Sequence, residues 1–141
     1  MFAPSAAHTA DLPEKVGEWR GMPAQVTEFT LTKDNENVGR WENRVYTRAA
    51  PIASVEANLM KGSGPGTLFV HEEGNEFTPP PYEVLNIAGK RAILEYEEAT
   101  GQALAVALGK DSTLTLESKS LSREELLSFA RNLIAILEVH S

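Results

Sequence analysis

The segment IASVEANLM, residues 52–60, gives the clearest indication of the fold. Apolar side chains occupy every second position and polar side chains lie between them, which is the period of a β-strand with one buried face and one exposed face. The inward positions are Ala53, Val55, Ala57 and Leu59. The segment therefore predicts a strand that needs an apolar cover on one side.

A helix at the C-terminal end of the chain is predicted to supply this cover. Ser122 and Glu125 form a capping box, in which the serine hydroxyl accepts from the backbone N–H of Glu125 and the carboxylate reaches back. Apolar residues then recur at spacings of three and four, at Leu126, Phe129, Ala130, Leu133, Ile136 and Leu137. So wide a stripe is typical of a helix that packs on a sheet.

Further strands are predicted on both sides of residues 52–60. A Thr-rich stretch from Gln25 and the run Trp41–Arg48 are separated by a polar turn at residues 33–37, and Trp41–Arg48 mixes apolar with charged side chains as a half-exposed strand does. Beyond the connection at residues 61–82, turn signals recur about every ten residues. They predict a meander with strands at 82–88, 92–97, 103–108 and 113–118.

The start of the chain predicts a second, short helix. Asp11-Leu12-Pro13-Glu14 places a capping acid before Pro and Glu, and Leu12, Val16 and Trp19 would then share one helical face. The predicted fold is therefore α+β, with an antiparallel sheet of about six or seven strands packed against the C-terminal amphipathic helix and a short N-terminal helix. Residues 11–141 are predicted to form one domain.

Composition excludes several functions. A length of 141 residues suits a single domain. The 13 Lys and Arg against 20 Asp and Glu give a net charge of −7, which disfavours nucleic acid and anionic membrane surfaces as partners. No stretch is apolar for long enough to span a bilayer. Zero Cys removes thiolate nucleophiles, disulfides and Cys-based metal sites.

The first ten residues, MFAPSAAHTA, bear on the compartment. They are rich in Ala, and Ser5-Ala6-Ala7 matches the small-x-small pattern that precedes signal-peptidase cleavage. Residues 1–10 are therefore predicted to be a signal-peptide remnant or a disordered tail, and the protein is predicted to be extracytoplasmic, in the periplasm or cell envelope.

The connection at residues 61–82 contains the candidate binding residues, because long irregular connections often carry function. KGSGPGT at 61–67 lacks the order of a phosphate-binding loop, since Lys61 precedes the glycines. His71 and the nearby Glu72, Glu73 and Glu76 could bring at most two ligands together on an extended segment, so neither a metal nor a cofactor is predicted. The predicted binding residues are Phe69, His71, Glu73, Phe77 and Tyr82.

Two partial resemblances point to the bacterial envelope. LPEKVGEWRG at 12–21, with Tyr46-Thr47-Arg48, resembles the opening of the exosortase-associated family, which lies on the outer face of the inner membrane, although the Cys-Leu-Pro-Gly motif of that family is absent. Residues 82–137, including IAGKRA and SREELL, are similar to the end of extracytoplasmic lipoprotein and anti-sigma sensor domains with the Mog1/PsbP-like fold. Neither resemblance implies catalytic residues.

The sequence therefore predicts a non-catalytic exported bacterial accessory domain. It would bind a protein or a small apolar ligand through residues 61–82 and the adjoining sheet face, in an oligomeric state that the sequence leaves open. Two alternatives remain. One is an acidic cytosolic protein of the secretion-chaperone type, and the other is a small metal-dependent hydrolase that uses His71 and nearby carboxylates.

Overall fold

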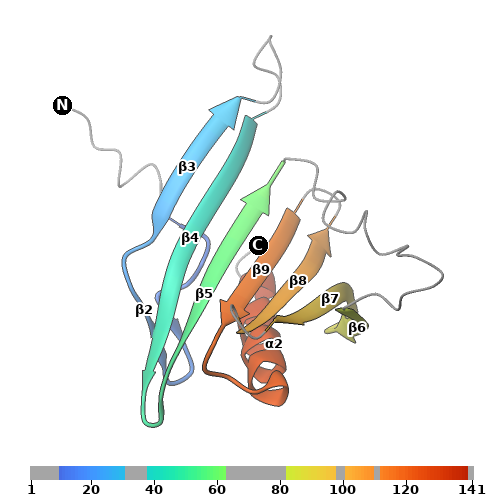
Figure 1. The fold of residues 1–141 in the computed structure, drawn as a ribbon. Helices are drawn as coiled ribbons and strands as arrows, with labels where there is room; N and C mark the ends of the chain where they lie inside the picture. The colour runs from blue at the N-terminus through green and yellow to red at the C-terminus, as the bar shows by residue number, and fades with distance from the viewer. Residues whose placement is uncertain (1–9, 31–37, 63–81, 98–100, 110–111, 140–141) are drawn as a thin grey trace.

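The computed structural model describes residues 10–30, 38–62, 82–97, 101–109 and 112–139. Within them the chain forms a nine-stranded, wholly antiparallel sheet and a helix near the C-terminus (Figure 1). The elements are β1 (Lys15–Val16), β2 (Trp19–Gly21), β3 (Gln25–Thr30), β4 (Val38–Ala49), β5 (Ile52–Lys61), β6 (Tyr82–Ile87), β7 (Lys90–Glu97), β8 (Gly101–Gly109), β9 (Ser112–Ser118) and α2 (Arg123–Val139).

The sheet consists of two groups of neighbouring strands, β1 to β5 and β6 to β9, which are joined by the pairing of β5 with β9. The strands run β1-β2-β4-β5-β9-β8-β7-β6, and β3 pairs with the part of β4 that β2 leaves uncovered. Helix α2 contacts β1 and β6, which are the two ends of this order, as well as β9. Because both ends of the sheet contact the same helix, the sheet wraps around α2.

The core lies between α2 and the face of the sheet that the alternation of residues 52–60 predicts. Ala57 pairs with Leu116 and Leu59 pairs with Leu114, so that inward side chains of β5 and β9 form continuous rows. Buried side chains of the helix meet these rows, and they are Leu126, Leu127, Phe129, Ala130, Leu133 and Ile134. Ile136 and Leu137 of the predicted stripe are only partly buried, because they lie in the last turns of the helix.

The predicted short N-terminal helix is wrong, and so is the predicted number of six or seven strands. The segment assigned to that helix forms β1 and β2, which add two strands to the seven that the pattern indicated. Val16 pairs with Trp19 across a two-residue turn, and Gly17 takes a φ of 58° at the position that a type II′ turn reserves for glycine. The apolar residues of this segment are therefore buried where the hairpin packs on α2.

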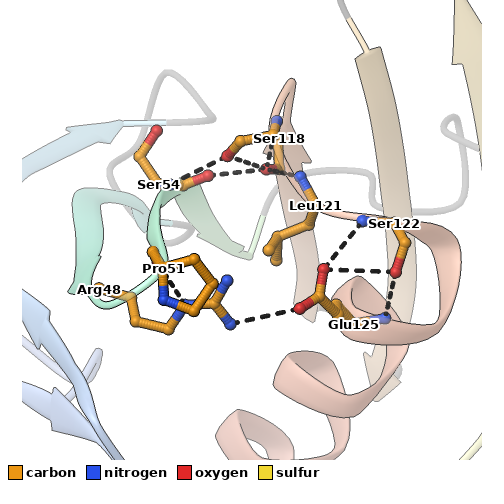
Figure 2. A network of polar contacts seen from close by, with 8 residues as sticks. Arg48, Pro51, Ser54, Ser118, Leu121, Ser122 and Glu125 are labelled. Atoms are coloured by element: carbon orange, nitrogen blue, oxygen red, sulfur yellow. Dashed lines mark hydrogen bonds and ion pairs between the residues drawn. The ribbon is translucent and has the colours of Figure 1, made fainter.

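The capping box is confirmed and is part of a larger polar network (Figure 2). Ser118 Oγ donates to the carbonyl of Ser54 at 2.7 Å and accepts from the backbone N–H of Leu121 at 3.2 Å. Arg48 donates to the carbonyl of Pro51 at 2.8 Å and lies 3.4 Å from Glu125 Oε2. These contacts attach the first turn of α2 to the turn between β4 and β5.

Candidate functional site

Glu42, Arg44 and Tyr46, at alternate positions of β4, hold the N-terminal segment, residues 10–22, against the sheet. Glu42 is fully buried, and its carboxylate accepts the backbone N–H groups of Asp11 at 2.8 Å and Leu12 at 3.0 Å. The guanidinium of Arg40 lies 3.0 Å from the same carboxylate. A buried charge needs such partners, because an unpaired carboxylate would be costly to remove from water.

Arg44 and Tyr46 continue this attachment along β4. Arg44 donates to the carbonyls of Met22 at 2.8 Å and Leu12 at 2.9 Å, and the Tyr46 hydroxyl donates to the carbonyl of Pro13 at 2.6 Å. Burial raises the pKa of Tyr46 well above its ordinary value of 10.0, with a smaller opposing effect from Arg44. These hydrogen bonds satisfy the backbone carbonyls of Leu12, Pro13 and Met22, which lie on either side of β1 and β2.

A pocket of about 800 Å³ lies between the N-terminal segment, the end of the sheet and the last turns of α2. Its apolar lining comes from the partly buried Leu108 on β8 and Leu137 on α2, next to the fully buried Leu59 on β5 and Ile134 on α2. Ala10, Asp11 and Pro13 form the wall that β4 holds in place. The pocket has the size of small-molecule sites in proteins, which range over about 300–1,000 Å³.

Two ion pairs line the pocket. The ammonium of Lys61 contacts the Asp11 carboxylate, and the ammonium of Lys90 lies 2.9 Å from Glu138 Oε2. Both lysines stand on strands of the sheet, whereas Asp11 belongs to the N-terminal segment and Glu138 to the last turn of α2. The pocket therefore combines an apolar lining with a small number of charged groups that can orient a ligand.

A smaller groove of about 330 Å³ lies between the β1–β2 hairpin and the first half of α2. The Arg48 guanidinium lies 4.9 Å from the centre of the Trp19 ring in this groove, and Glu125 pairs with it. Phe129 closes the inner side, 5.2 Å from Trp19 between ring centres. These contacts explain the groove as part of the packing of the hairpin, so the larger pocket is the better candidate site.

Of the predicted binding residues, Tyr82 alone belongs to the part of the chain that the structure describes, and it is not among the lining residues of this pocket. Phe69, His71, Glu73 and Phe77 lie outside the described residues. Tyr82 is the first residue of β6 and is half-buried, and it pairs with Glu95 on the face of the sheet turned away from α2. The prediction for residues 61–82 as a binding region is therefore neither supported nor contradicted by the described structure.

Two of the pocket residues are marked by their positions in the sequence. Lys61 continues the inward series of Ala57 and Leu59, and Lys90 likewise precedes the inward Ala92 and Leu94 by one period. A lysine at an inward position predicts either that the strand extends beyond the packed core at that residue or that the charge lies beside a cavity. The burial of Glu42 and Arg44 had no comparable signal, because charged residues at alternate positions usually mark a solvent-facing strand.

Known proteins offer no further guide to this site. Comparison of the chain with protein-family models, curated proteins and solved structures gives no match. In the part of the chain that the structure describes, no three His, Cys, Asp or Glu side chains group as metal ligands would. Among the same residues, no helix has the length and apolar character needed to cross a bilayer.

Proposed function

We propose that this chain is a non-catalytic binding domain that takes a small, mainly apolar molecule into the pocket between the sheet and the end of α2. The observation that carries this proposal is the pocket of about 800 Å³, in which Leu108 and Leu137 present apolar surface beside the lysines. Apolar lining with few polar groups is the usual form of a site that binds by burial of apolar surface.

The charged groups of the pocket favour binding over catalysis. Lys61 and Lys90 each have a carboxylate partner, and no histidine is found among the described lining residues. A hydrolytic site would need a nucleophile or a water activated by a base within hydrogen-bond reach. The pocket supplies orientation and apolar surface, which suffice for a carrier or an accessory domain.

An extracytoplasmic location completes the proposal. Its support is the small-x-small pattern at Ser5-Ala6-Ala7 and the resemblance of residues 12–21 to envelope proteins. In that compartment, a non-catalytic domain would present or store its ligand for another component of the envelope.

Binding of an uncharged environment-sensitive dye tests this function. Nile red added to the full chain should bind at one saturable site with a blue-shifted emission. Leu108→Trp and Leu137→Trp place an indole in the pocket and should each abolish the binding. Ile52→Trp is the matched control, because Ile52 is 86% exposed on β5 and an added indole there lies in solvent.

Two results would overturn the proposal. One is a chain that binds no dye while it remains folded by circular dichroism. The other is equal binding by Leu137→Trp and Ile52→Trp, which would place the dye elsewhere. If both pocket variants unfold, methyl NMR of the unaltered chain decides the question, because bound dye must then shift the signals of Leu59 and Leu137.

A further inference from the structure

Two lysines line the pocket at one end of the sheet, and each of them is paired with a carboxylate. Lys61 on β5 lies opposite Arg40 on β4, and Lys90 begins β7 on the same face. Lys61 and Lys90 line the pocket, while the whole chain has a net charge of −7. Because Lys61 pairs with Asp11 and Lys90 with Glu138, an anionic ligand would bind a lysine of this lining by taking the place of its carboxylate partner.

The carboxylates that pair with these lysines come from the periphery of the fold. Asp11 lies on the N-terminal segment, and its side chain is 41% exposed, about as much as that of Lys61 at 43%. Glu138 lies in the last turn of α2, and its side chain is 53% exposed, whereas that of Lys90 is 21% exposed. An exposed ion pair is worth little, about 0–1 kcal/mol, so that an anion of a ligand can replace either carboxylate at small cost.

The spacing of the lysines allows one anionic group to pair with one lysine at a time. β9 and β8 separate β5 from β7, which places the two strands roughly 14 Å apart along the sheet. The sheet wraps around α2, and both lysine side chains extend into the same pocket. Ser112, which lies opposite Lys61 in the sheet, adds a hydroxyl to the lining between them.

We propose that the ligand of this pocket is a single-chain amphiphile with an anionic head, of the long-chain carboxylate class. Its head replaces Asp11 or Glu138 as the partner of Lys61 or Lys90, and its tail lies against Leu108 and Leu137. The inference rests on the proposed function and adds the chemical class of the ligand.

Calorimetric titration of the full chain with matched probes tests this ligand class. Dodecanoate, dodecyltrimethylammonium and dodecyl maltoside share one tail and differ in the charge of the head, and each is kept below its micelle concentration. Acetate and inorganic phosphate provide the anion without the tail. We expect dodecanoate to bind most tightly and to lose affinity at high salt, because screening weakens exposed charge pairs. The two free anions should not bind measurably.

Charge variants of the pocket provide the second measurement. The double variant Lys61→Met and Lys90→Met keeps the apolar stems and should weaken dodecanoate binding about two- to fivefold, as expected for the loss of a partly exposed charge pair. Lys119→Met is the matched control, because Lys119 is exposed and does not line the pocket. Asp11→Asn and Glu138→Gln remove the competing carboxylates and should each strengthen the binding, an effect that a merely structural ion pair would not produce.

The outcomes separate the two proposals. Equal affinity for dodecanoate and dodecyl maltoside leaves the binding function intact and overturns the anionic class, as does tighter binding of the cationic amphiphile. Equal affinity for phosphate and dodecanoate overturns the role of the tail. Failure of all three amphiphiles to bind a folded chain overturns both the ligand class and the binding function.

Discussion

Removal of the Glu42 carboxylate is predicted to release the N-terminal segment and to lower the stability of the whole domain. Glu42 is fully buried, accepts the backbone N–H groups of Asp11 and Leu12, and pairs with Arg40. The substitution Glu42→Ala leaves these donors without an acceptor in a region that water does not reach readily. The segment that they belong to also forms a wall of the pocket.

The size of the effect follows from these contacts. Loss of one partner of a buried ion pair costs about 3–5 kcal/mol, and each buried N–H group left unsatisfied costs about 1–3 kcal/mol. Arg40 is 22% exposed and can recover some hydration. Because Arg40 and Asp11 are both partly accessible to water, these costs apply only in part, and we expect about 3–5 kcal/mol for Glu42→Ala. Glu42→Gln keeps one acceptor oxygen and should cost about 1–2 kcal/mol, since neutral hydrogen bonds are roughly half as strong as charge-assisted ones.

Urea denaturation followed by the fluorescence of Trp19 and Trp41 measures these losses. Hydrogen exchange adds local information, because the amides of Asp11 and Leu12 should lose protection first. Glu117→Ala is the control: Glu117 is exposed on β9 opposite Glu56, and removal of one of two like charges should be neutral or slightly stabilising. Equal denaturation midpoints for Glu42→Ala and Glu117→Ala would refute the assigned role of Glu42.

Three further predictions concern the core and the helix ends. Tyr46→Phe removes the hydrogen bond to Pro13 and should cost about 1 kcal/mol in urea denaturation at neutral pH. Because burial raises the pKa of Tyr46, the wild-type chain should also lose stability as the pH rises from 10 through that raised pKa, and the variant should lose less. Hydrogen bonds from Arg123 hold the pKa of the Glu83 carboxyl below 4.5, so this pair stabilises the fold above that pH and its contribution disappears as the pH falls further. Denaturation midpoints of Glu83→Gln should accordingly change less with pH on the acid side of 4.5 than those of the wild type, and parallel curves would contradict the pairing. Phe129→Ala should cost about 3–5 kcal/mol by calorimetric melting, with a clearly smaller loss for Phe129→Leu, because the ring packs edge-on against two other aromatic rings.

The positions of several strands and of the helix could be predicted from local patterns of apolar residues and turn residues. The alternation at residues 52–60 and the three–four spacing after Ser122 each follow from one buried face, and the structure places β5 and α2 at these residues. The turn signals after residue 82 located β6 to β9 for the same reason, since a turn depends on neighbouring residues alone. Lys61 and Lys90 could also have been noticed, because they occupy inward positions of otherwise apolar series.

The conformation of the N-terminal segment and the formation of the pocket depend on contacts between residues that are far apart in the chain. Leu12, Val16 and Trp19 have a spacing that suits a helix, yet the segment forms β1 and β2, because β2 pairs with β4. Side chains of β4 also bond to the backbone on either side of this hairpin. Those partners come near only after β4 has joined the sheet, so no local pattern can reveal them. The pocket likewise depends on where the ends of β5, β8 and α2 meet, which is a property of packing between elements distant in the chain.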